Sequence, residues 1–310
     1  MNGNNGRSLS PQKSAPSKSW THYALWCGVR DALSALPAYF HSDTFIEGVS
    51  ATDIFALNSA LAATIENQVV DTLNRIRSVW DPADKYGACC FVRQPQSFPD
   101  VVLKDLANPD SPPLLGIELK GWYLLAKEGE PSMRFTQTEA ACAEADLIMV
   151  VPWVLASVIS GRPVIFAPYI EGARYAARYR NYYWEELRGA KAATGITVPS
   201  NAHPYPKANE ATTDKPRVDG GGNFGRIART GIMDDYLRRM MVQPVCGIQA
   251  RYWLEFFKIF HQDATDATIA AALKRLKEQV GFLSTPAMRA EFQNVIAALE
   301  KLAVTECENG

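Results

Sequence analysis

The feature that most constrains the fold of this 310-residue chain is an uninterrupted apolar run at residues 147–151 (LIMVV), directly after Asp146. A strand with one face in water alternates apolar and polar residues, whereas a strand covered on both faces is apolar throughout. The run therefore predicts a fully buried strand, and with it an α/β fold in which helices sandwich a mixed sheet. The apolar stretch 147–159 contains Pro152 and is shorter than the ~20 apolar residues of a membrane helix.

Segments before this strand fit the same fold class. Residues 50–80 carry apolar side chains at helical spacing and predict one long helix. Residues 101–103 and the apolar run 114–125 predict two strands. Residues 136–139 (TQTE) match a capping box, with threonine at the N-cap and glutamate three residues later, and predict the start of a short alanine-rich helix.

Segments after this strand add one more strand and several helices. A short helix and Gly161 are predicted to lead into a strand over residues 163–169. The C-terminal third is predicted to be mostly helical, with helices over residues 250–261, 263–280 and 286–302. The central order is therefore helix, strand, strand, helix, strand, followed by a helical C-terminal region.

Two short stretches place acidic side chains and a lysine beside predicted strands. Asp100 precedes a β-branched pair at residues 101–102, and Glu118 and Lys120 lie inside the apolar run 114–125. Side chains alternate between the two faces of a strand, so Glu118 and Lys120 project to the same side. Two carboxylates and an amine brought together at a strand end form a site for a divalent cation and an activated water, which is the chemistry of phosphodiester hydrolysis.

The ligand types in this pattern favour magnesium. Asp100 and Glu118 repel each other unless a cation neutralises them, and Mg²⁺ binds oxygen ligands while it keeps several waters. Two carboxylates and one backbone carbonyl, that of Leu119, are therefore sufficient protein ligands, and Mn²⁺ is expected to substitute for Mg²⁺. The ammonium group of Lys120 can orient the attacking water, help to deprotonate it or stabilise the developing negative charge.

These residues resemble the motif of the PD-(D/E)XK nuclease superfamily, the fold group of most type II restriction endonucleases. Pro99-Asp100 is similar to the first half-motif, and Glu118-Leu119-Lys120 is similar to the second. The resemblance implies a restriction-endonuclease-like mixed β-sheet core, with Asp100, Glu118 and Leu119 as metal ligands and Lys120 as a catalytic residue. Taken as a bare pattern, the same residues are better described as two solvated strand residues and an unrelated turn aspartate; the predicted elements around the motif favour the nuclease.

The resemblance covers residues 50–170 and gives a role to Glu66 as well. Superfamily members often carry an acid on the helix that precedes the motif, where it assists metal or water binding. Glu66 lies at the edge of the apolar stripe of the predicted helix 50–80, from which it would face a sheet. It is then an accessory catalytic acid; alternatively it is an ordinary boundary residue of that helix.

The net charge of −1 means that DNA binding would require positive charge gathered on one face. One basic cluster lies on a helix predicted over residues 174–184, and a second spans residues 215–239. The second cluster contains residues 220–223 (GGGN), predicted as a flexible loop that orders on DNA before a helix capped by Asn223. Alternatively, each cluster is a solvated helix face with intrahelical ion pairs. The arginines predicted to bind DNA are Arg134, Arg174, Arg178, Arg180, Arg217, Arg226 and Arg229.

Composition indicates a globular protein, because 47% of residues are hydrophobic and 10% are aromatic. Residues 1–19 lack the apolar core of a signal peptide and are predicted to be a flexible tail. Residues 20–310 are predicted to form a single domain, with a catalytic core at 50–170 and decorations for DNA recognition and dimerisation at 171–310. The six cysteines lack metal-ligand spacing, which favours reduced thiols and a cytoplasmic location.

The residues and the resemblance together predict a Mg²⁺-dependent type II restriction endonuclease that cuts double-stranded DNA as a homodimer, with no membrane partner. No helicase, methyltransferase or ATPase motif accompanies the predicted core, so a nuclease of this size would carry its own sequence specificity. Two alternatives stay open. One is a repair, recombination or phage-related nuclease of the same fold that acts on DNA structure, and the other is a catalytically silent DNA-binding protein in which the acidic pair is structural.

Overall fold

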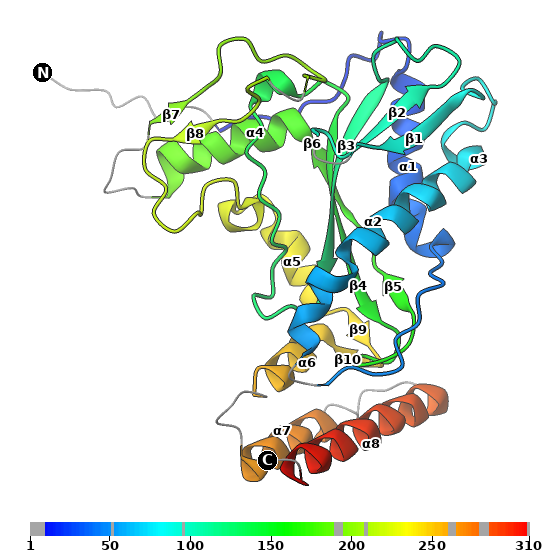
Figure 1. Ribbon diagram of the computed structural model, residues 1–310, viewed down its shortest axis with the longest axis vertical. Coiled ribbons are helices and arrows are strands. Elements are labelled where there is room, and N and C mark those ends of the chain that lie inside the picture. The colour runs from blue at the N-terminus through cyan, green and yellow to red at the C-terminus, as the bar shows by residue number, and fades with distance from the viewer. Residues whose placement is uncertain are drawn as a thin grey trace, which may run out of the picture.

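The computed structural model is a mixed α/β protein built on one curled six-stranded sheet (Figure 1). It describes residues 10–50, 53–94, 97–188, 195–207, 210–259, 265–278 and 285–308. The coarse fold class predicted from the sequence is therefore confirmed. None of the helices in these ranges is long and apolar enough to cross a membrane.

Five of the six strands follow the chain order, and the pair β3 and β4 is parallel. The sheet order is β1-β2-β3-β4-β5, with β6 also paired to β4. β3 and β4 are parallel, whereas every other neighbouring pair in this sheet is antiparallel. The strands are β1 (Cys89–Arg93), β2 (Val101–Asp105), β3 (Leu115–Tyr123), β4 (Leu147–Leu155), β5 (Pro163–Ile165) and β6 (Tyr169–Gly172).

The predicted buried strand is confirmed as β4, and it runs farther than the apolar run alone indicated. All nine of its residues are buried. β4 pairs with β6 as far as Val150 and with β5 from Trp153 onward. Pro152, which has no N–H to donate, lies between these two pairings, where the neighbouring strand changes. Its carbonyl still accepts a 2.9 Å hydrogen bond from the amide of Phe166.

The helix predicted over residues 50–80 is wrong as a single element. The described part of this segment forms a 3₁₀ turn at Ile54–Ala56, the helix α2 (Leu57–Arg75), which crosses the sheet diagonally (Figure 1), and the short helix α3 (Arg77–Trp80). The break lies at Ile76, whose backbone leaves the helical conformation. The indole of the buried Trp80 donates a 2.9 Å hydrogen bond to the carbonyl of Leu73. This carbonyl in the last turn of α2 therefore has a hydrogen-bond partner from the core.

The capping box predicted at residues 136–139 is also wrong. Only a 3₁₀ turn, Glu139–Ala141, follows it; its N-cap residue is Thr138 rather than the predicted Thr136, and Thr138 makes no side-chain capping hydrogen bond. The backbone is instead paired in an extended manner, because the amide of Thr138 donates to the carbonyl of Thr212 and the amide of Asp214 donates to that of Thr136. Long-range pairing therefore replaces the helix start that the local sequence favours.

Two further expectations need correction after β4. Residues 156–162 form turns rather than a short helix, and the strand predicted over 163–169 is divided into β5 and β6. The predicted helices of the C-terminal third are confirmed, although each has different bounds. The remaining elements are α4 (Ala173–Tyr182), η3 (Tyr183–Leu187, a π-helix), β7 (Ile196–Thr197), β8 (Lys215–Pro216), η4 (Ile227–Thr230), α5 (Asp234–Met241), β9 (Pro244–Val245), β10 (Ile248–Gln249), α6 (Ala250–Phe257), α7 (Asp266–Glu278) and α8 (Pro286–Glu308).

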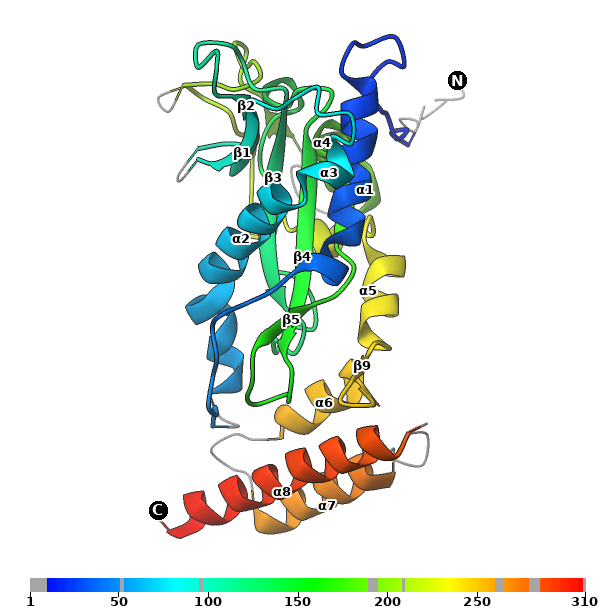
Figure 2. The ribbon, with the colours of Figure 1, turned by 90° about the vertical axis from the view of Figure 1, so that its right-hand side faces the viewer.

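The helices α7 and α8 lie side by side at the end of the molecule opposite β1 and β2 (Figures 1 and 2). Their buried apolar residues belong to the same hydrophobic core as the sheet. The ring contact between Trp253 of α6 and Phe292 of α8, with centroids 6.1 Å apart, joins the two parts of this core.

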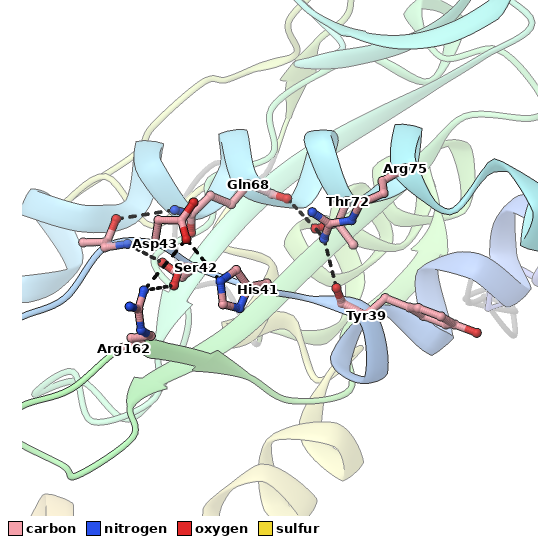
Figure 3. Close-up of polar contacts among 9 residues, drawn as sticks. Tyr39, His41, Ser42, Asp43, Gln68, Thr72, Arg75 and Arg162 are labelled. Atoms are coloured by element: carbon pink, nitrogen blue, oxygen red, sulfur yellow. Dashed lines mark hydrogen bonds and ion pairs between the residues drawn. The ribbon is translucent and has the colours of Figure 1, made fainter.

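Polar contacts fix the segment that connects α1 (Tyr23–Tyr39) to α2, as Figure 3 shows. Arg75 of α2 donates to the backbone carbonyl of Tyr39 at 3.0 Å. Arg162, from the turn before β5, donates to the carbonyl of Ser42 at 2.8 Å. These contacts hold the connection against α2, the helix that carries Glu66.

Part of the predicted tail lies along α4. Lys13 forms a 2.5 Å ion pair with Glu171, and the hydroxyl of Ser14 accepts a 2.8 Å hydrogen bond from Arg178. Residues 1–9 of the predicted tail lie outside the described residues. The five cysteines in the described part of the chain are all free thiols.

Candidate active site

Asp100 lies where β3 extends beyond its neighbour β2. The last residue pair of these two strands is Val101 with Ile117, so the following part of β3 has no β2 residue opposite it. Asp100 fills this position with its side chain, because the amide of Leu119 donates a 3.0 Å hydrogen bond to Asp100 Oδ2. The Asp100 carboxylate thus accepts the next hydrogen bond from β3, at the point where the β2 backbone no longer pairs with that strand.

Gly116 permits this close approach of the motif to β3. A Cβ at position 116 would overlap the ring of Pro99 and lie 3.0 Å from Asp146 Oδ1. Any larger residue would push Pro99 and the adjacent Asp100 away from the strand. The glycine therefore helps to set the position of the first carboxylate.

Glu66 reaches the same edge of β3 from helix α2. The amide of Gly121 donates a 3.1 Å hydrogen bond to Glu66 Oε1, and the other oxygen of Glu66 lies 3.3 Å from the guanidinium of Arg93. Amides two residues apart in a strand point to the same edge. The carboxylates of Asp100 and Glu66 therefore accept hydrogen bonds from two successive amides on this edge of β3, those of residues 119 and 121.

Glu118 and Lys120 project from the other face of β3. A Cβ at Gly121 would lie 3.6 Å from Ala62 of α2, so the odd-numbered residues of this strand face that helix. Glu118 and Lys120 therefore point away from α2, on one common face, as predicted. Both residues are partly buried.

A cavity of about 250 Å³ brings two of the predicted catalytic residues together. Asp100 and Glu118 both line it. Lys120 is not among the lining residues, yet its charge lowers the pKa of both carboxyl groups. Asp100 and Glu118 thus share one cleft, and Lys120 acts on both of them through its charge.

The carboxyl groups of Asp100 and Glu118 are both costly to ionise in this cleft. Burial, together with the nearby charge of Asp100, raises the pKa of Glu118 to about 8. Burial and the charge of Glu66 raise the pKa of Asp100, against the lowering effect of its hydrogen bond from the Leu119 amide. A cation placed between Asp100 and Glu118 would offset this cost and favour both ionised forms.

The donor set fits a hard cation that keeps most of its water. The residues that the structure describes include no group of three histidine, cysteine or acidic side chains arranged to hold a metal ion. Asp100 and Glu118 would therefore supply two carboxylates, and the backbone carbonyl of Leu119 points to the same strand edge as its amide. Mg²⁺ accepts so few protein ligands, whereas Zn²⁺ and Ca²⁺ usually have more.

Sequence reasoning did not anticipate the opposite wall of the cleft. Ser97 and Phe98 directly precede the motif, whereas the other lining residues are far along the chain from Asp100, namely Gln137, Pro206, Lys207, Glu210 and Thr212. Gln137 stands out because its side-chain oxygen is buried and has no hydrogen-bond partner in the described part of the chain. Nothing in the local sequence of residues 206–212 indicates that they face Asp100 and Glu118.

The structure corrects one predicted DNA contact, that of Arg180. Its side chain is 1% exposed and forms an ion pair with Asp214, which is itself fully buried. It also donates to the carbonyls of Phe135 and Gln137. Arg180 therefore holds segments together inside the protein and cannot reach a phosphate.

Arg174 and Arg178 lie on α4, as predicted, but both already have partners. Arg174 donates a 2.7 Å hydrogen bond to the carbonyl of Cys142. Arg178 lies 3.5 Å from the carboxylate of Glu139 and donates to Ser14. A phosphate would have to compete with these contacts.

Three of the four remaining predicted DNA contacts, Arg134, Arg226 and Arg229, lie around the glycine-rich turn that contains Asp219 and Asn223. Arg134 and Arg226 form an isolated β-bridge, and Arg134 and Arg229 form ion pairs with Asp219 and Glu130, at 2.7 Å and 2.5 Å. Arg217 is exposed.

The glycine-rich loop is a hydrogen-bonded turn in this structure. Asp219 Oδ1 accepts from the amides of Asn223 and Phe224, and Gly221 and Gly222 have positive φ angles. The helix predicted to be capped by Asn223 is wrong, because the next element, the 3₁₀ helix η4, begins at Ile227.

No protein-family model, curated protein sequence or solved structure matches this chain. The geometry of the cleft and the two acids that line it, Asp100 and Glu118, are therefore the features that bear on its function.

Proposed function

We propose that this protein is a Mg²⁺-dependent DNA endonuclease with a restriction-endonuclease-like fold, and that it acts as a type II restriction enzyme. The observation that carries the proposal is the shared cleft of Asp100 and Glu118, two carboxyl groups with raised pKa beside the backbone of Leu119. Such a pair is costly to ionise without a cation and suited to binding one.

The arrangement of strands supports the same proposal. The first half-motif directly precedes β2 and the second lies on β3; β2 and β3 form an antiparallel pair, and β3 also forms a parallel pair with β4. A helix that precedes these strands contributes Glu66 to the same strand edge. The superfamily that the motif resembles builds its active site from this combination of an acidic helix and neighbouring strands.

Each motif residue has a definite task in this proposal. Asp100, Glu118 and the carbonyl of Leu119 would hold Mg²⁺, which supplies an acidified water and stabilises charge on the phosphate oxygens. Lys120, on the same face as Glu118, would orient the water or stabilise the developing charge. Glu66 would hold the end of β3 and Arg93 in place beside Asp100.

Digestion of plasmid DNA tests this function. The purified protein is incubated with supercoiled plasmid and Mg²⁺, and the product ends are sequenced. Discrete fragments with one common end sequence are the expected result. Smears or trimmed ends would point to a nuclease that acts on DNA structure, and intact plasmid would point to a catalytically silent DNA-binding protein.

A further inference from the structure

The second wall of the catalytic cleft is tied directly to the catalytic strand. Tyr205 has a positive φ of 54°, unusual for a residue with a side chain, and its hydroxyl donates a 2.8 Å hydrogen bond to Asp146 Oδ1. The same oxygen accepts from the amide of Gly116 on β3 at 2.6 Å. Asp146 is 1% exposed, so this link is sheltered from water.

The other end of this wall is fixed as well. The amide of Thr138 donates to the carbonyl of Thr212 at 2.7 Å, and the amide of Asp214 donates to the carbonyl of Thr136 at 2.9 Å. Asp214 is paired with the buried Arg180. Because both ends are anchored, Pro206, Lys207 and Thr212 are held opposite the two acids.

Among the described residues that line the cleft, Lys207 carries the only positive charge. The cleft acid nearest to it in sequence, Glu210, is already engaged, because its Oε2 lies 3.0 Å from His203 Nε2 and accepts from the Lys207 backbone amide at 2.9 Å. Within the described residues, the Lys207 ammonium has no ion pair, and the residue is exposed. Because Lys207 lines the cleft and its ammonium has no ion pair among the described residues, that ammonium is available to an anionic ligand.

We propose that Lys207 binds a backbone phosphate of the DNA strand that enters this cleft. The inference rests on the proposed function, since it concerns how the same site holds its substrate. Asp100, Glu118 and Glu210 would repel a polyanion, and the positive charge of Lys207 in the same cleft offsets part of that repulsion. A phosphate contact of this kind positions the strand and carries no sequence information.

Binding and cleavage by Lys207→Ala test the proposal, with Lys258→Ala as the matched control. Lys258 is an exposed lysine at the end of α6, outside the cleft, and its removal changes the net charge equally. Duplex affinity is measured by fluorescence anisotropy in Ca²⁺ at several salt concentrations. We expect Lys207→Ala to bind about tenfold more weakly, with a salt dependence lower by about one ion. Lys207→Arg should restore most of the affinity, because it keeps the charge.

The cleavage assay separates this inference from the proposed function. In Mg²⁺ the KM of Lys207→Ala should rise about tenfold while kcat stays within about twofold of the wild type. If the wild type cuts and Lys207→Ala matches Lys258→Ala in affinity, salt dependence and KM, the role of Lys207 is refuted and the nuclease function stands. If the wild type neither binds nor cuts DNA, both proposals fail. If it binds without cutting, the anisotropy comparison still decides the role of Lys207.

Discussion

At the scale of single residues, the protonation of Glu118 matters most for the proposed metal site. Its pKa is raised to about 8, mainly by burial and then by the charge of Asp100. Near neutral pH and without metal, the side chain is therefore largely protonated. A metal ion must displace that proton before Glu118 can serve as a ligand.

The first prediction follows from this competition between proton and metal. At low Mg²⁺, the cleavage rate should rise with pH with a midpoint near 8, where half of the Glu118 side chains have lost their proton. Higher Mg²⁺ should move the midpoint of this rise to lower pH, because the ion favours the carboxylate. Rates measured across pH at two Mg²⁺ concentrations check this. A midpoint that does not move with Mg²⁺ would show that the proton and the ion do not share Glu118.

The second prediction concerns Lys120, whose charge acts on both cleft acids. If Lys120 serves the transition state, Lys120→Ala should lower kcat by about a hundredfold or more. Its affinity for duplex DNA in Ca²⁺ should stay close to that of the wild type, because interactions made only in the transition state affect the rate. Single-turnover cleavage and anisotropy measure the two effects. A variant that cuts at the wild-type rate would reduce the motif to a coincidence of sequence.

At the scale of elements, prediction from the sequence succeeded where a local pattern is compatible with only one kind of element. Five apolar residues in a row predicted β4, and the alternation of residues 118–120 placed Glu118 and Lys120 on one face. Prediction failed where a distant partner decided the outcome. The helix over 50–80 breaks because Trp80 returns to the Leu73 carbonyl. The capping box pairs with residues 212–214 instead.

The cleft itself shows the same limit. The motif predicted the wall that carries Asp100 and Glu118, since both half-motifs are local. The facing wall depends on the hydrogen bond from Tyr205 to Asp146, a contact between loops far apart in the chain. No local signal in the sequence specifies such a contact.

The third prediction tests that contact. Tyr205→Phe removes a hydrogen bond to a buried carboxylate and should lower the free energy of unfolding by about 1–2 kcal/mol. Because Tyr205 positions Lys207, the KM for DNA should rise by more than kcat falls. Tyr39→Phe is the control, since Tyr39 is 47% exposed. An unchanged KM in a destabilised Tyr205→Phe protein would restrict Tyr205 to a structural role.

At the scale of the whole molecule, the sequence contains one set of motif residues, and two of them, Asp100 and Glu118, line one described cleft. A palindromic DNA site is most simply cut on both strands by two identical active sites related by a two-fold axis. The helices α7 and α8 lie at the end of the molecule away from β1 and β2 (Figure 2), and α2 carries Glu66. These helices are the candidate surfaces for self-association.

The fourth prediction is therefore a homodimer on DNA. Light scattering of the protein, alone and with cognate duplex in Ca²⁺, should give the mass of two chains in the complex. Double-strand breaks should then appear without a long-lived nicked intermediate. A single chain per duplex, with nicked plasmid accumulating first, would instead favour sequential cutting or the structure-directed nuclease.

The central claim is that Asp100 and Glu118 form a metal-dependent nuclease centre, and plasmid cleavage by the wild type and by Asp100→Asn tests it most directly. Asparagine keeps the size of the side chain and its ability to accept from the Leu119 amide, but it removes the charge. We predict cleavage by the wild type in Mg²⁺ or Mn²⁺, no cleavage in excess EDTA or in Ca²⁺ alone, and a loss of about a hundredfold or more for Asp100→Asn in Mg²⁺. Wild-type cleavage that persists in excess EDTA, or an Asp100→Asn variant that cuts as fast as the wild type, would contradict the claim.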